Sequence, residues 1–245
     1  MKRVLSSLLV LALTSAALIT CDQEEGDGGT GVGVASPSSL PSYEGSIPSD
    51  DDVVISALSE VTTNIENERV SISQANGESG NGTWTSQYNE TVSGYDAGGT
   101  MNLNGNERES WNDSSYNWTG DVSIQLSEYS CRSGVSTVEG VSQIAEREAM
   151  TVSSSTGDYS ISVLYEFSLS ASMSGSDCAG KYILFMSVTA AETGSVSSDA
   201  EWEATVNNLG VSGTGYLKIY DNDDGLAREI DLTESEMEQL FPEYD

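Results

Sequence analysis

The 245-residue sequence contains no histidine. This absence excludes Ser-His-Asp and Cys-His nucleophilic systems, histidine general bases and every zinc site that uses a histidine ligand. Because few common catalytic designs remain, we expect neither enzymatic activity nor a bound cofactor.

Basic residues are also scarce, with 9 Lys and Arg against 39 Asp and Glu, for a net charge of −30. Such a surface repels nucleic-acid phosphates and anionic lipid headgroups, so we expect no nucleic-acid partner and no electrostatic binding to a bilayer. The acids are scattered along the chain, which favours plain solubility outside a cell over a cation-binding or salt-adapted surface. With so many acids, carboxylate pairs of the glycosidase kind arise by chance and indicate no site.

Long hydrophobic runs are missing except at the start of the chain. Lys2 and Arg3 precede an uncharged apolar run, 4–19. This run is shorter than the ~20 residues of a membrane-spanning helix and no stop-transfer charges follow it, so we predict a cleaved export signal over residues 1–20.

The end of this run, Leu18, Ile19, Thr20 and Cys21, resembles the lipobox of bacterial lipoproteins, in which the cysteine is diacylated and the peptide is cut just before it. The resemblance covers residues 1–21 only. It implies a lipoprotein of the bacterial cell envelope, anchored through Cys21 by palmitate-like chains to the inner or outer membrane, with its domain facing the periplasm or the exterior. The family usually has Gly, Ala or Ser where this chain has Thr20, so the alternative is a signal peptide with an incidental cysteine.

Residues 21–50 after the signal are rich in Gly, Ser, Pro and acids. This composition buries too little apolar surface to offset its ordering entropy, and it predicts a flexible tether. Residues 51–245 are then expected to form a single β-rich domain.

A helix is predicted at the start of the domain. Ser49 and the acids 50–52 form a start signal, and Val54, Leu58, Val61 and Ile65 recur at helical spacing, which predicts an amphipathic helix over 51–66. At the other end, Thr233 and Glu236 form a capping box that predicts a short C-terminal helix.

Period-two patterns dominate the chain between the two predicted helices. The clearest is 159–173, where apolar residues alternate with serines; it predicts a long strand with one buried face and one face in water. The other predicted strands are 84–92, 100–104, 111–118, 122–126, 135–152, 182–190, 202–206, 215–220 and 227–232. Short connections between them predict a mainly β fold, an antiparallel meander of about 8–10 strands that is curled or sandwich-like.

Two cysteines remain beyond the predicted anchor. In an oxidising compartment Cys131 and Cys178 are expected to form a disulfide, since both fall in loops at the same end of the predicted sheet. They are two strands apart, so one loop must fold back or the sheet must curl strongly to bring them together.

The strongest metal candidate is the acidic turn 221–225, in which Asp221, Asp223 and Asp224 offer oxygen ligands suited to calcium. Against an EF-hand loop the spacing fails, and a hairpin turn with Gly225 at a positive-φ position accounts for the same residues.

These observations favour a non-catalytic, lipid-anchored binding or envelope-structural module whose protein or apolar-ligand partner the sequence does not identify. A first alternative is a carrier that holds an apolar or acyl ligand between sheet and helix, by fold-level analogy with periplasmic lipid-carrier lipoproteins. A second is a carboxylate- or calcium-dependent enzyme. A continuous apolar cavity under residues 54–65 would favour the carrier, and a filled core would oppose it.

Overall fold

A computed structural model describes residues 32–75, 82–94, 98–112, 114–132, 136–153, 155–175 and 178–240. Within these ranges only the backbone is described for 70–75, 82–90, 92, 131, 132, 136, 199, 203 and 207. The predicted export signal and Cys21 lie outside the described residues.

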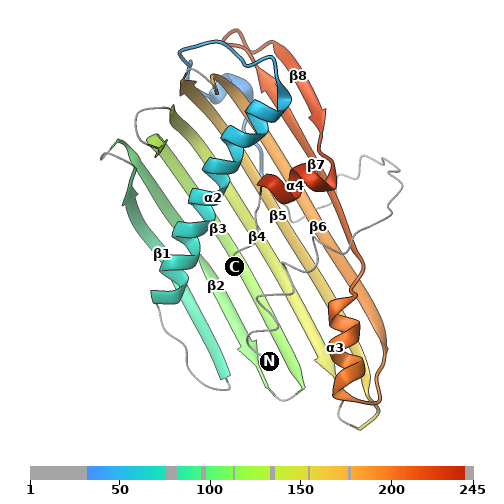
Figure 1. Ribbon diagram of the computed structural model, residues 1–245. Helices are drawn as coiled ribbons and strands as arrows, with labels where there is room; N and C mark the ends of the chain where they lie inside the picture. Colours follow the sequence, from blue (N-terminus) through green and yellow to red (C-terminus); the bar gives the residue numbers. More distant parts are fainter. Residues whose placement is uncertain are drawn as a thin grey trace.

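The centre of the protein is one sheet of eight antiparallel strands, in which each strand pairs with the next along the chain (Figure 1). The strands are β1 (Gly82–Ser93), β2 (Thr100–Trp111), β3 (Ser115–Arg132), β4 (Ser136–Val152), β5 (Asp158–Gly175), β6 (Gly180–Ser195), β7 (Val211–Tyr220) and β8 (Leu226–Asp231). The predicted antiparallel meander is therefore confirmed. Among the described residues it forms a single sheet and not a sandwich.

Strand boundaries differ from the prediction around β2 and β3. The predicted strand 111–118 straddles the turn between them, and the predicted strands 100–104 and 122–126 are parts of longer strands. The apolar alternation of β2 stops after Leu103 because its next positions on the same face are Gly105, Glu107 and Glu109. The backbone of β2 therefore stays paired as far as Trp111, although its apolar alternation ends at Leu103.

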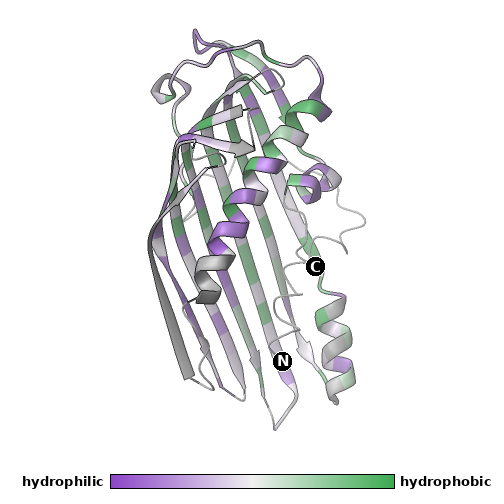
Figure 2. Ribbon diagram, turned by 60° about the vertical axis from the view of Figure 1, so that its left-hand side comes forward, coloured by the Kyte–Doolittle hydropathy of each residue, from purple (hydrophilic) through white to green (hydrophobic). Residues whose placement is uncertain are grey.

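The inner face of the sheet, the face that carries the alternating apolar residues of β5, forms the core. Figure 2 shows hydrophobic and hydrophilic residues alternating along the central strands. Phe167 and Leu169 of β5 are fully buried, as are Ile124 of β3 and Leu184 of β6. Registered antiparallel pairing brings these residues side by side across the central strands.

Helix α2 (Asp51–Ala75) crosses this inner face, with helix α4 (Glu234–Leu240) beside it (Figure 1). Val54, Leu58, Val61 and Ile65 are at most 1% exposed, as the spacing predicted. The carboxylate of Asp50 accepts from the amide of Asp52, so Asp50 caps the helix. No helix among the described residues is long and apolar enough to cross a membrane.

The C-terminal capping box is confirmed. The amide of Thr233 donates to Glu236 Oε2 at 2.7 Å, and the amide of Glu236 donates to Thr233 Oγ1 at 3.3 Å. Met237 and Leu240 are buried below this turn. The short helix therefore adds its apolar side to the core next to α2.

The predicted strand 202–206 is wrong, because these residues belong to helix α3 (Asp199–Asn207). Ser198 caps the helix by accepting from the amide of Glu201, and the Glu201 carboxylate accepts from the amide and hydroxyl of Ser197. The Trp202 ring packs edge-on against Tyr159 of β5, with ring centroids 5.5 Å apart. A Ser-x-x-Glu start signal was present in the sequence and outweighed the short apolar alternation.

Residues 32–50 differ most from the prediction. They form an ordered strap along the outer face of the sheet, the face opposite the helices, and include a 3₁₀ turn (Pro37–Ser39). Side chains of β4 and β5 hold the strap through its main chain: Gln143 with Gly33, Ser168 with Gly33, Ser170 with Ala35, Ser172 with Pro41, and Ser174 with Glu44. The expectation of a flexible tether therefore fails for this part of 21–50.

Part of the β5 face that was predicted to be in water is covered by the strap. Ser168, Ser170 and Ser172 are 1–4% exposed, although they occupy the polar positions of the alternation. Ser160 and Ser162, further along the same face, are exposed as expected. The strap then passes over the end of the sheet, where Arg228 of β8 donates to the carbonyls of Pro48 and Ser49, and it enters α2.

Candidate functional site

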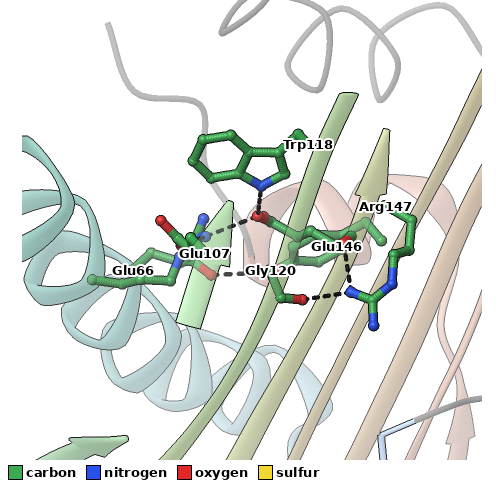
Figure 3. A network of polar contacts seen from close by, with 8 residues as sticks. Glu66, Glu107, Trp118, Gly120, Glu146 and Arg147 are labelled. Atoms are coloured by element: carbon green, nitrogen blue, oxygen red, sulfur yellow. Dashed lines mark hydrogen bonds and ion pairs between the residues drawn. The ribbon is translucent and has the colours of Figure 1, made fainter. Parts of the chain in front are cut away.

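A buried cluster of charged side chains joins α2 to the inner face of the sheet (Figure 3). Arg69 of α2 contacts three carboxylates: Glu66 one turn earlier at 2.8 Å, Glu107 of β2 at 2.8 Å and Glu146 of β4 at 2.9 Å. The side chain of Arg69 is 11% exposed, and that of Glu107 only 1%. One cation therefore serves three carboxylates away from bulk water.

Strand register creates the space for this cluster. Glu107 and Glu146 occupy the same row of the sheet, on either side of Gly120 in β3. A Cβ at Gly120 would lie 3.3 Å from Glu146 Oε2 and 3.4 Å from Glu107 Cγ. Because the middle strand has no side chain there, the guanidinium can reach both carboxylates.

Two aromatic side chains complete the hydrogen bonding of the cluster. The indole N–H of Trp118 donates to Glu146 Oε2 at 2.9 Å (Figure 3), and the hydroxyl of Tyr165 donates to Glu66 Oε1 at 3.1 Å. Burial would lower the pKa of Arg69, but Glu146, Glu66 and Glu107 raise that pKa well above its usual value. The guanidinium therefore stays charged at any pH at which the protein folds.

The next row of the sheet places Glu109 of β2 and Glu148 of β4 on either side of Trp118. Burial, followed by repulsion from Glu146 and Glu109, raises the pKa of Glu148 to about 8. Burial and the nearby Glu148 also raise the pKa of Tyr116. At neutral pH this row therefore holds a protonated carboxyl group next to the Arg69 cluster.

The sequence did not identify this cluster. The sequence marks the cluster only by the Glu-x-Glu spacing of Glu107 with Glu109 and of Glu146 with Glu148, which places each pair on one face of a strand but does not say which face is buried. Their meeting with Arg69 depends on the register of three strands and on the path of α2. Trp118 lies on the inner face of the sheet and donates a hydrogen bond to Glu146.

The cysteines predicted to pair lie at the same end of the sheet. Cys131 falls near the end of β3 and Cys178 in the turn between β5 and β6. β3 and β5 are two strand spacings of about 4.8 Å apart, a separation of about 10 Å. A disulfide needs its two Cα atoms within ~7 Å. No disulfide is found among the described side chains, which do not include Cys131. The Cys131–Cys178 pairing therefore stays a prediction, and the strand spacing argues against it.

The acidic turn 221–225 is held by its own hydrogen bonds. Asp221 Oδ1 accepts from the amides of Asp223 and Gly225, and Asp224 pairs with Lys181 of β6 at 2.6 Å. The positive φ of 63° falls on Asp224 and not on Gly225 as predicted. Gly225 leaves room for the Asp221 carboxylate, since a Cβ there would lie 2.8 Å from one of its oxygens.

The described residues contain no group of three His, Cys, Asp or Glu side chains that could hold a metal ion. The calcium candidates Asp221, Asp223 and Asp224 thus form a turn in which two carboxylates already have partners within the protein.

Comparisons with protein-family models, with curated proteins and with solved structures find no match to this chain.

Proposed function

We propose that this protein is a lipid-anchored module of a bacterial cell envelope, attached to a membrane through Cys21, which binds a partner and catalyses no reaction. The observation that carries the proposal is the strap, considered together with the lipobox-like sequence. The chain that follows the proposed anchor is fastened to the sheet from Gly33 onward by five side-chain contacts to its main chain. An anchor at Cys21 would therefore hold a firmly attached domain at a short distance from the bilayer.

The chemistry of the inner face supports a non-catalytic role. Glu66, Glu107 and Glu146 are all engaged by Arg69, and Trp118 and Tyr165 occupy further lone pairs of two of these carboxylates. Carboxylates held in this way join α2 to the sheet. The apolar side of α2 is packed against the sheet with at most 1% exposure, which favours a surface module over a carrier with a cavity at that place.

One observation favours a carboxylate-dependent enzyme as a second candidate. Glu148, with a pKa of about 8, lies beside Glu146, and a carboxyl group that keeps its proton at neutral pH next to a second carboxyl group is suited to acid catalysis. Screening the purified protein against glycoside and ester substrates, with Glu148→Gln as the matched variant, tests this role. Turnover that the variant loses would replace the binding-module proposal.

The anchor is tested by mass spectrometry of the mature N-terminus in a bacterial host that makes lipoproteins. We expect a chain that starts at Cys21 and carries a diacylglyceryl group, and a Cys21→Ala variant that leaves the membrane fraction. Thr20→Gly is the matched control, because it brings the sequence closer to the usual lipobox and should speed processing without changing the anchored product. A mature chain that starts elsewhere and lacks lipid would refute the proposal.

A further inference from the structure

The outer face of the sheet differs in charge from the rest of the protein. The paired positions of β2 to β8 that face outward include four basic residues and six acidic ones, a net charge of −2 against −30 for the chain. The basic residues are Arg108, Arg147, Lys181 and Lys218, and the acidic ones are Asp121, Glu139, Asp158, Glu166, Glu229 and Asp231. Four of the nine basic residues of the chain therefore lie on this one face.

Uncharged hydrogen-bonding side chains occupy most of the remaining outward positions. Exposed examples include Asn102, Asn104, Asn106, Asn117, Thr119, Ser123, Gln125, Ser160, Ser162, Thr189, Ser212 and Thr214. The strap adds no charge between Val32 and Tyr43. This face is thus a broad, nearly neutral surface of hydroxyl and amide groups.

The strap begins on the same face. Its first residues lie over the middle of the sheet, where Gly33 contacts Gln143 of β4 and Ser168 of β5. Cys21 precedes Val32 by eleven residues. At ~5–6 Å × √n, a relaxed Gly-rich coil of this length spans about 18 Å.

That length is short compared with the path to the other side of the sheet. The edge of the sheet at β8 is three strand spacings from β5, about 14 Å. The thickness of the sheet and the layer packed on it adds about 10 Å to the path. A lipid on Cys21 therefore reaches the bilayer most easily when the outer face is turned toward it.

We propose that the outer face of the sheet lies against the lipid headgroups of the membrane and that the helix-covered face points away from it. This inference rests on the proposed lipid anchor. Both the length of chain before Gly33 and the distribution of charge favour it, because an anionic headgroup layer repels the acidic helix-covered side more than the neutral outer face. The partner of this surface is the bilayer, and the helix-covered side is left free for a soluble partner.

The test uses the full lipidated protein in vesicles of phosphatidylethanolamine and phosphatidylglycerol at 3:1. A genetically encoded fluorescent amino acid is placed at Ser123 or Ser162 on the outer face, or at Ser56 or Ser235 on the helices, and energy transfer to a headgroup-labelled lipid is measured. All four positions are exposed. We expect transfer from the two sheet positions to exceed that from the two helix positions at least twofold.

A second pair of variants tests the charge argument. Thr119→Asp with Ser162→Asp adds two charges to the outer face and should lower the transfer measured from Ser123. Ser56→Asp with Ser235→Asp adds the same charge to the helix side and should leave that transfer unchanged.

Suppose that the protein is bound to the vesicles but energy transfer is equal from both faces, or that the two pairs of Asp substitutions have equal effects. Either result would overturn the orientation while leaving the anchor intact. If the wild-type chain separates from the vesicles on sedimentation, it is not bound to them, which is the result expected for Cys21→Ala. That result would overturn the anchor and the orientation together.

Discussion

Replacing Glu148 by Gln should make the protein more stable at alkaline pH. The pKa of Glu148 is about 8 in the folded protein against its ordinary value of 4.5, so the folded form keeps a proton that the unfolded chain releases between these two pH values. Stability from this group is therefore fully present below about pH 4.5 and is lost as the pH rises to about 8. The amide of Glu148→Gln keeps the shape of the neutral carboxyl group and cannot ionise.

The size of the effect follows from the pKa difference of about 3.5. At 1.36 kcal/mol for each pKa unit the full loss is about 5 kcal/mol, and partial exposure of Glu148 reduces this by roughly half. We expect Glu148→Gln to gain about 2–3 kcal/mol over wild type between pH 5 and pH 9. With a urea m-value of about 2–3 kcal/mol/M, the unfolding midpoint should move by about 1 M.

Urea unfolding at pH 5, 7 and 9, followed by tryptophan fluorescence, measures this difference. The control is Glu139→Gln, the same substitution on the same strand at an exposed outward position, which should follow wild type within about 0.5 kcal/mol at each pH. If the midpoint of Glu148→Gln falls with pH in parallel with wild type, then Glu148 is ionised in the folded protein and the account of the inner-face charges is wrong.

Three further substitutions test other parts of the structure. Arg69→Met leaves three buried carboxylates without their cation and should cost about 3–5 kcal/mol of unfolding free energy, measured in urea. Adding Glu107→Gln should recover part of this loss. An unchanged unfolding free energy in Arg69→Met would contradict a buried ion cluster. Ser170→Ala removes the hydroxyl that accepts from Ala35 and should cost about 0.5–1.5 kcal/mol and speed proteolysis within residues 32–50, whereas exposed Ser160→Ala should do neither. Thr233→Ala removes the cap of α4 and should lower stability by about 1 kcal/mol in thermal unfolding, and an unchanged melting temperature would mean that the cap contributes nothing.

Much of the fold follows from local pattern. The alternation in 159–173 predicted β5, the spacing of Val54, Leu58 and Val61 predicted α2, and Thr233 with Glu236 predicted the start of α4. Short connections then restricted the strands to an antiparallel meander. These features are readable because each depends on residues only a few positions apart.

The failures arise where a local pattern is compatible with two environments. Alternate serines on β5 fit water and fit a covering main chain equally well, because a hydroxyl hydrogen-bonds to either. Only the folded chain shows that residues 33–44 take the place of water there. For the same reason, the glutamates of β2 ended the predicted strand although their backbone pairing continues.

Local patterns therefore predicted most of the strands, two of the helices and the acidic character of the protein. Which polar groups are buried depends on long-range contacts, because Arg69 meets Glu107 and Glu146 through strand register and the path of α2, across 38 and 77 residues of the chain. Burial of a charge depends on what packs over it, and no local pattern records that.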